Sequence, residues 1–542
     1  MIPTQRSAAL ISVFVLLFAA TVYFLTLTPT VPFWDSGEFI AVATILGIPH
    51  PPGTPFYVLL ARIATLVPWA SIAQRVNALS AVAAALTVWL TYLSTLRLIR
   101  VAQGDERKPW QEWVAVLAAA VGALLLAFSD AFWENSIEAE VYQLMSLAQI
   151  LVFWLGLKWW EAHGSKPSVG PLLVATYVMW LCVGLHLGVG IMGLPLFVFL
   201  LFVDRTIALL FLMPFLSLLR VPAGLEKMAG AVIMLSLATA AGMVWKKKLN
   251  GWVVLGAAAL ALPGLQASFS DANFSMQTAI LTTLAVIGPM VWLARSHREG
   301  RVLLLSLFLM VAGYSTHLYL PIRAAQHPAI NEGAPATWDK MRDLLERKQY
   351  GEMNPLVRRA PLMAQLDKEF WRYFQRQWPL FPTDRLWGAL LPIALGLAGG
   401  FWQFRREKKS FLLTFAFLGL STVGMIVFLN FTDHEVRDRD YFFQSGFHAY
   451  SMWIGLGVAW LIQWVRESFE GKDAQRMATL GTSALLGTMP VLLLVNLYHT
   501  HDRSQNYIAR DYAYNMLANL KPNSFMFTNG DNDTFPLWYI QQ

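Results

Sequence analysis

The stretch AALISVFVLLFAATVYFLTLT, residues 8–28, decides the class of fold, because it carries no charged residue over its whole length. An α-helix needs about 20 mainly apolar residues to cross the hydrocarbon of a bilayer. This run is longer than the apolar part of a usual signal peptide, and no small-residue cleavage site follows it. It therefore predicts an uncleaved membrane-spanning helix.

Composition extends this expectation to the whole chain. Of 542 residues, 56% are hydrophobic and only 14% are charged, whereas a typical soluble protein is about 25% charged. These values exclude an ordinary soluble protein and a disordered one, and the single cysteine excludes a disulfide scaffold. The net charge of +7 lies in short basic clusters between apolar runs. That pattern is a signal of membrane topology and not of nucleic-acid binding.

Further apolar runs predict an all-α polytopic membrane protein with about 13–15 transmembrane helices and short interfacial helices in its outer loops. The fifteen candidate spans are Ala8–Thr28, Ile72–Leu98, Trp113–Phe132, Val141–Trp160, Pro171–His186, Leu187–Val203, Thr206–Leu219, Ala229–Trp245, Trp252–Gln266, Met276–Ala294, Val302–Leu320, Leu386–Phe404, Phe411–Phe431, Phe447–Val465 and Met477–Tyr498.

The connectors between these spans fall into two sets. With the N-terminus inside, the cytoplasmic connectors carry clusters of Lys and Arg, as at 97–108 and 405–409, while the opposite connectors 129–140 and 268–275 carry none. This is the bias of the positive-inside rule. We expect an integral protein of a bacterial-type inner (plasma) membrane, with a transmembrane domain at 1–498 and the start of an extracytoplasmic C-terminal region at 499–542. The expected outer loops are 28–71, 129–140, 321–385 and 432–446.

The first outer loop carries two carboxylates in WDSGEF, Asp35 and Glu38, directly after the first span. A carboxylate beside hydrocarbon is costly and usually has a partner or a function, and partial desolvation raises its pKa towards that of a useful base. The alternative is that Asp35 caps a short interfacial helix, with Glu38 completing a loose capping box. The following HPPGTP, which begins at His50, predicts a rigid backbone.

The second outer loop adds Glu134 and Glu138, which are four residues apart and are expected to share a helix face. Without a cation between them they would repel, so the pair indicates a metal site or an Arg from another loop. The alternative is a solvated helix end.

Two later segments add basic residues on the same side. Arg323, close to His317, is suited to bidentate binding of a lipid phosphate, and the alternative is snorkelling of a long basic side chain. In DHEVRDRDYFF (433–443), alternating charges favour an internally paired network. Arg437 or Arg439 remains a candidate second phosphate ligand.

Motifs for a P-loop ATPase, a zincin and a G-x-S-x-G hydrolase are absent from the sequence. Other motifs, taken in order, carry a resemblance. They are WDSGEFIAVATILGIPHPPGTPFYVLLARI (34–63), FWENSIEAEVYQL (132–144), PIRA with HPAINEGAPATW (321–338), EVRDRDYFF (435–443) and NGDNDTFPLWY (529–539). Together they resemble a family of polytopic membrane proteins long catalogued as a domain of unknown function. Its animal member is a protein O-mannosyltransferase, and the family resembles the GT-C class of lipid-sugar-dependent glycosyltransferases.

The resemblance implies a GT-C-like helical bundle and a transferase that moves a sugar, expected to be mannose, from a polyprenyl-phosphate donor to a hydroxyl of an exported protein. In that class an acidic residue of the first outer loop is the base, which here corresponds to Asp35 and, second, Glu38. The donor phosphate would be bound by Arg323 with Arg437 or Arg439. Supporting roles are expected for positions in or just before the same motifs, namely His50, Glu134, Glu138, His317, Asp438, Asp440 and Tyr441.

Other expectations concern the ligands and partners. Asp531 and Asp533 of the GDND segment are expected to serve the acceptor or the outer region. The HPAINEGAP segment lacks an expected Trp before its Gly, and the chain stops at Gln542, where bacterial members are expected to continue. We therefore expect acceptor recognition to be truncated or supplied by partner subunits. A divalent metal ion stays open as a cofactor. Membrane lipid is an expected partner, and nucleic acid is not.

Two other classes of function stay open at this point. A transporter or lipid-carrier flippase would also have many helices, but its site is expected near the midplane of the membrane. Here the ionisable residues are scarce in the middles of the spans and gather at one side. A non-catalytic scaffold subunit of a membrane complex is the second alternative.

Overall fold

The structure is a computed structural model that describes residues 5–164, 168–216, 297–351, 357–382, 385–432 and 437–542, together with positions 245, 251, 291, 294, 295 and 435. Within these ranges the chain is helical, and its only β-pairing is an isolated bridge between Ile48 and Asn331. The predicted all-α class is confirmed.

The bounds of the helices are as follows. In the first part of the chain they are α1 (Gln5–Leu25), α2 (Ser36–Ile45), α3 (Pro55–Thr65), α4 (Ile72–Gln103), α5 (Pro109–Ala127), α6 (Asp130–Ser136), α7 (Tyr142–His163), α8 (Gly170–Cys182), η1 (Leu187–Met192), α9 (Gly193–Val203) and α10 (Arg205–Leu216). In the second part they are α14 (Arg298–Tyr314), η2 (Ser315–Leu318), α15 (Tyr319–Ala324), α16 (Trp338–Leu345), η3 (Lys348–Tyr350), α17 (Leu362–Gln365), η4 (Leu366–Trp371), α18 (Arg372–Phe374), α19 (Arg385–Arg406), α20 (Lys408–Gly419), η5 (Leu420–Gly424), α21 (Met425–Leu429), η6 (Asp440–Phe443), α22 (Gln444–Glu467), α23 (Lys472–Gly487), α24 (Met489–His501), α25 (Ile508–Ala518) and α26 (Asp531–Gln541).

The helices agree with most of the predicted spans. The predicted spans at 229–245, 252–266 and 276–294 lie almost entirely outside the described residues, and the other twelve each overlap a helix. Seven helices or joined helix pairs in the described part are long and apolar enough to cross a membrane. Four more apolar helices are shorter, α2 and α3 among them. The chain is thus an integral membrane protein, and its orientation in the membrane stays a prediction.

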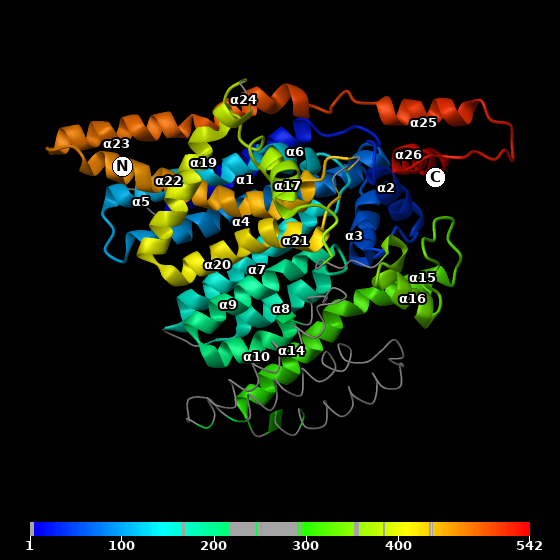
Figure 1. Cartoon of the computed structure of the whole chain (residues 1–542), viewed down its shortest axis with the longest axis horizontal. Helices are drawn as coiled ribbons and strands as arrows, with labels where there is room; N and C mark the ends of the chain where they lie inside the picture. The colour runs from blue at the N-terminus through cyan, green and yellow to red at the C-terminus, as the bar shows by residue number, and fades with distance from the viewer. Residues whose placement is uncertain are drawn as a thin grey trace.

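The loops that the sequence assigns to one side gather at one end of the bundle. Figure 1 shows α2, α3, α15, α16 and α26 together at the right, whereas the N-terminus and the α4–α5, α19–α20 and α22–α23 turns lie at the left. The left end carries the basic connectors, such as 104–108 and 405–409. The two predicted sets of connectors are therefore separated in space.

The core of the bundle is held together by close helix crossings. The most extensive pairs are α19 with α22, α5 with α22, and α4 with α5 and α7. At the α19–α22 crossing, a Cβ on Gly457 would lie 1.9 Å from the carbonyl oxygen of Leu395, so only glycine fits there. Small residues at such crossings let two backbones approach, which is how helices gain contact in a lipid environment.

We predict that Gly457→Ala will destabilise the protein by about 2 kcal/mol, since overpacking of a filled interface typically costs 1–3 kcal/mol. The measurement is thermal unfolding of the purified protein in detergent. Gly481→Ala on α23 is the matched control, because nothing lies within 4 Å of a Cβ at that position. There the better helix propensity of alanine should leave stability equal or slightly higher. Equal loss in both variants would contradict the close crossing.

Candidate active site

The WDSGE turn is held against the C-terminal helix. Trp34 has a positive φ of 67°, and its backbone N–H donates to the Asn532 side-chain oxygen of α26 at 3.2 Å. A Cβ on Gly37 would lie 2.6 Å from the backbone of Phe535, so α2 and α26 approach too closely for any side chain at this position. Segments from the two ends of the sequence thus form one wall of the candidate site.

Asp35 stands immediately before α2 and makes no side-chain capping hydrogen bond to that helix. The capping-box alternative for Asp35 is therefore wrong. Its carboxylate lies 3.8 Å from the Arg437 guanidinium, and the two side chains are only 20% and 16% exposed. The same guanidinium lies over the ring of Trp34 at 4.1 Å and that of Tyr441 at 4.9 Å. Contacts with the faces of two aromatic rings hold the Arg437 guanidinium in place. Its distance of 3.8 Å from Asp35 is longer than that of a hydrogen-bonded ion pair.

Glu38 lies one helical turn further along and is completely buried. One of its oxygens accepts the backbone N–H of His50 at 2.8 Å, and the other is 2.5 Å from His50 Nδ1. Burial opposes the charged form of His50, but the paired Glu38 outweighs it and raises the pKa of His50 to about 9. The structure thus gives Asp35 and Glu38 different surroundings.

The second outer loop adds three carboxyl groups, of which Glu140 is buried, Glu138 is half-buried and Glu134 has a side chain that is 44% exposed. Helix α6 ends at Ser136, so Glu134 and Glu138 do not share a helix face as expected. Burial raises the pKa of Glu134 to about 7 and that of Glu138 to about 8. Burial, with Asp35 nearby, raises the pKa of Glu140. At neutral pH the site therefore holds fewer negative charges than its carboxyl groups suggest.

Divalent metal binding at this cluster gains no support from the geometry. Among the described ranges, no group of three His, Cys, Asp or Glu side chains is arranged to hold a metal ion. Glu134 lies instead 3.7 Å from the Arg503 guanidinium. Binding of a divalent metal ion by this protein stays a prediction.

The acidic residues Asp438 and Asp440 of the EVRDRDYFF segment are paired, but with arginines that lie elsewhere in the chain. Asp438 binds Arg372 at 2.8 Å and Arg376 at 2.7 Å. Arg376 also binds Asp440 at 2.8 Å and Asp130 at 2.9 Å. The expected internal network is therefore mainly a network to the 372–376 segment. This pairing leaves the neighbouring arginines of the segment to other contacts.

Arg439 and Tyr441 complete this side of the site. Arg439 donates to the Tyr441 hydroxyl at 3.0 Å and lies 3.5 Å from Glu435. Its backbone N–H donates to the Tyr373 hydroxyl at 2.8 Å. Arg439 thus lies two positions after Arg437 in the sequence, and both arginines contact Tyr441.

Arg323 and His317 are placed away from Asp35. The Arg323 guanidinium donates to the carbonyl oxygens of Leu46 at 2.8 Å and Ile45 at 3.1 Å, at the end of α2. His317 is buried, stacks on Tyr314 at 4.0 Å between ring centroids and contacts its carbonyl oxygen. Arg323 therefore satisfies the C-terminal carbonyls of α2, a structural contact that differs from the predicted phosphate clamp.

The two aspartates of the GDND segment also separate. Asp531 lies within electrostatic reach of Asp35, His50 and Arg437, so it belongs to the candidate site. Burial raises the pKa of its carboxyl group. Asp533 instead accepts a hydrogen bond from the Tyr512 hydroxyl at 3.0 Å, joining α25 to α26.

Sequence reasoning missed several residues of the site, including Arg372 and Arg376. Their spacing of four residues is helical, but α18 ends at Phe374, so the sequence pattern did not show that both would meet Asp438. Asn532 and the role of Trp34 gave no signal in the sequence, because they depend on the packing of α26 against α2.

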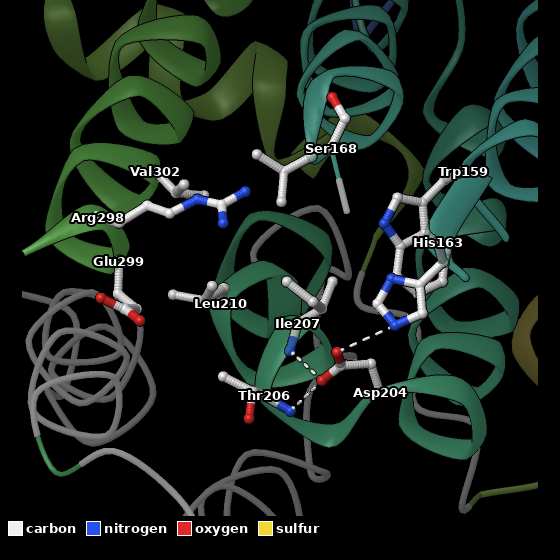
Figure 2. Close-up of a pocket in the computed structure, with 11 residues that line it drawn as sticks. Trp159, His163, Ser168, Asp204, Thr206, Ile207, Leu210, Arg298, Glu299 and Val302 are labelled. Atoms are coloured by element: carbon white, nitrogen blue, oxygen red, sulfur yellow. Dashed lines mark hydrogen bonds and ion pairs between the residues drawn. The ribbon is translucent and has the colours of Figure 1, made fainter. Parts of the chain in front are cut away.

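Two cavities lie near charged groups. One, of about 400 Å³, borders the Arg376 network and is lined by Asp130, Glu134, Arg376, Pro379, Phe381, Pro382, Asn496, Leu497, Thr500, His501 and Arg503. The other, of about 170 Å³, lies where the end of α7 meets the starts of α10 and α14 (Figure 2). There Asp204 caps α10, accepting the N–H of Thr206 at 2.9 Å, and lies 3.3 Å from His163 Nε2. This second cavity shares no residue with the candidate site.

We predict that Arg376→Ala will destabilise the protein by about 2–3 kcal/mol, because it removes a largely buried cation shared by three carboxylates. Thermal unfolding measures this loss. Arg376→Lys should recover only part of it, since an ammonium cannot replace a planar fork of five donors. Arg510→Ala is the control, because its pair with Asp511 is exposed on both sides and such pairs contribute about 0–1 kcal/mol. A harmless Arg376→Ala would contradict the network.

Comparisons with known proteins bear on the same residues. Residues 35–209 match the family described as "Protein O-mannosyl-transferase TMEM260 N-terminal domain", and residues 509–542 match "TMEM260-associated domain 2". The chain is 38% identical over 165 residues to the mouse protein O-mannosyl-transferase TMEM260, and 26% identical over 152 residues to the Dictyostelium discoideum protein of that name. These matches cover 30% and 27% of this chain, and the chain spans only 22% and 17% of the length of those relatives.

Among solved structures, the fold is similar to the Archaeoglobus fulgidus oligosaccharyltransferase, with a TM-score of 0.45 and 15% identity over 94% of this chain and 56% of that chain. The same protein tethered to an acceptor peptide gives a TM-score of 0.39 and 13% identity over 98% of this chain and 59% of that one. The matched segments 35–209 and 509–542 contain Asp35, Glu38 and the close approach of Gly37 to Phe535 of α26. In these two segments the chain is similar to the TMEM260 protein O-mannosyl-transferases, which confirms the predicted family resemblance.

Proposed function

We propose that the protein is a glycosyltransferase that moves a sugar, expected to be mannose, from a polyprenyl-phosphate donor to a Ser or Thr hydroxyl of an exported protein at the outer face of the membrane. The observation that carries the proposal is the pairing of Asp35 with Arg437 at 3.8 Å, at one end of a bundle of membrane helices. The names of the mouse and Dictyostelium relatives support the reaction class. A lipid-linked donor suits an enzyme that works where nucleotide sugars are absent.

The chemistry divides between Asp35 and the arginines. Asp35 takes the proton of the acceptor hydroxyl while that oxygen forms a bond to the anomeric carbon. The bond from the anomeric carbon to the phosphate oxygen breaks on the opposite face of the sugar, so the configuration inverts. The leaving polyprenyl phosphate keeps the electron pair, and Asp35 later returns its proton to water.

Charge on the leaving phosphate needs fixed cations. Arg437 is held by two aromatic rings and is only loosely paired, so its N–H groups can reach a phosphate oxygen. Arg439 borders the same Tyr441. Preorganised donors of this kind stabilise developing charge without reorganisation of the site. Arg323 is left out of this clamp because its guanidinium is bound to the end of α2.

A carrier flippase and a scaffold subunit are the competing functions. If either were the function, the protein itself would transfer no sugar, and neutralising Asp35 would not change the amount of glycosylated product. The position of the buried acidic groups at one end of the bundle, close to α2 and α26, favours chemistry at a membrane surface over a site at the midplane.

We predict that Asp35→Asn will lower the transfer rate at least 100-fold, since a positioned base contributes about 10² to 10⁴. The assay uses the protein in liposomes with a radiolabelled polyprenyl-phosphate sugar and an acceptor peptide. Asp511→Asn, an exposed carboxylate on α25, is the matched control. An unchanged rate in Asp35→Asn would remove Asp35 from the reaction. Movement of the lipid across the membrane with no glycosylated product would favour the flippase.

We predict separately that Arg437→Ala will lower kcat about 100- to 1,000-fold, the usual effect of losing one electrostatic donor. Arg437→Lys should recover part of that loss, because the charge remains while the stacking geometry is lost. The same liposome assay, run at saturating donor, separates kcat from KM. A variant that changed only KM for the acceptor would contradict a role at the leaving phosphate.

A further inference from the structure

Glu38 and His50 form a closed unit beside Asp35. Both carboxylate oxygens of Glu38 are occupied by His50, one by its backbone N–H at 2.8 Å and the other by Nδ1 at 2.5 Å. Glu38 is 0% exposed, whereas the side chain of Asp35 is 20% exposed. A carboxylate with no oxygen facing the outside cannot take a proton from an acceptor hydroxyl. Glu38 therefore has a different role from that of Asp35.

The position of His50 is fixed from three directions. Its carbonyl oxygen accepts the N–H of Gly53 at 2.9 Å, which closes the HPPG turn. Two residues earlier, Ile48 donates to Ile330 at 2.9 Å and accepts from Glu332 at 3.1 Å. This contact ties the loop to the segment that follows α15. With Nδ1 committed to Glu38, the ring can rotate little.

The outer edge of the His50 ring is then available to a ligand. Its side chain is 28% exposed, and among the described residues Nε2 has no hydrogen-bond partner. When Nδ1 and Nε2 both carry protons, the ring presents one N–H towards the mouth of the site. The Asp35 charge lies within electrostatic reach of the same ring.

Most of the groups that face His50 favour its charged form. They are Glu38 and Asp35 around α2, Glu140 after α6 and Asp531 on α26, whereas a positive charge on His186 after α8 would oppose it. Burial disfavours the imidazolium, but the carboxylates, with Glu38 first, raise the pKa of His50 to about 9. The charge is thus present at neutral pH and is lost as the pH rises through about 9.

We propose that Glu38 is a positioning residue that holds His50 as an imidazolium, and that the Nε2–H of His50 binds a phosphate oxygen of the lipid-linked donor. The inference rests on the proposed function and deepens it, since it gives the phosphate a cation on the α2 side in addition to Arg437. Asp531 lies within electrostatic reach of both cations, and Asp35 interacts with both as well. The first outer loop then supplies both the base and part of the phosphate site.

The test measures binding of a methyl polyprenyl phosphodiester to the full chain in phosphatidylcholine nanodiscs, from pH 6 to pH 10. A diester keeps one negative charge over that range, so any change in affinity with pH must come from ionisation of a group on the protein. The wild type should bind more weakly as the pH rises through about 9. His50→Gln should bind about tenfold more weakly at pH 7 and lose the step, in line with the loss of one charge-assisted hydrogen bond.

Two further variants separate positioning from catalysis. Glu38→Gln should move the step in affinity to lower pH, because the pKa of His50 loses its main support. His50→Lys should keep the affinity at pH 7, since it restores a cation. His499→Gln, an exposed histidine on α24, should change nothing.

The outcomes distinguish the inference from the proposed function. Unchanged affinity and an unchanged pH step in His50→Gln would overturn the inference, while transfer by the wild type would leave the function in place. Loss of kcat in Glu38→Gln at every pH, with normal diester binding, would make Glu38 the base and overturn its positioning role. A wild type that binds no diester and transfers no sugar would overturn both.

Discussion

The candidate site depends on the way in which α2 is held at the end of the bundle. This helix is short and apolar, and each part of it is fixed by a segment distant in sequence. Its start packs on α26, with no room for a side chain at Gly37. Its final carbonyls accept hydrogen bonds from Arg323, and the chain after it pairs with residues 330–332 through Ile48. Near a membrane interface, polar backbone groups must be satisfied within the protein, and these contacts also fix Asp35, Glu38 and His50.

This arrangement explains how much the sequence could predict. The all-helical class and most of the spans follow from long apolar runs, a signal that needs no tertiary information. The gathering of WDSGE and EVRDRDYFF at one end also followed from the alternation of basic and non-basic connectors. Because the two segments lie at the same end of the bundle, Asp35 of one can pair with Arg437 of the other. The roles of these residues in transfer remain proposals.

Other features could not be predicted because they depend on three-dimensional packing. Arg323 has the chemistry of a phosphate ligand, but only the structure shows that the end of α2 takes up its guanidinium. Glu134 and Glu138 have helical spacing, yet α6 ends between them. Arg376 stands more than fifty residues before its partners Asp438 and Asp440, so no local pattern joins them. Sequence identifies the chemical groups, and packing decides which of them meet.

The charges at the site are balanced by burial as well as by pairing. A cluster of carboxyl groups would ordinarily repel a phosphate. Burial raises the pKa of Glu138 to about 8, so this group tends to stay protonated near neutral pH, and burial also raises the pKa of Glu140. Arg437 and His50 then face fewer negative charges than the composition of the loops implies. Buried acids of this kind can donate hydrogen bonds to a phosphate without adding charge. Under the proposed function, the same enclosure that separates Glu38 from an acceptor hydroxyl thus makes an acidic cluster compatible with an anionic donor.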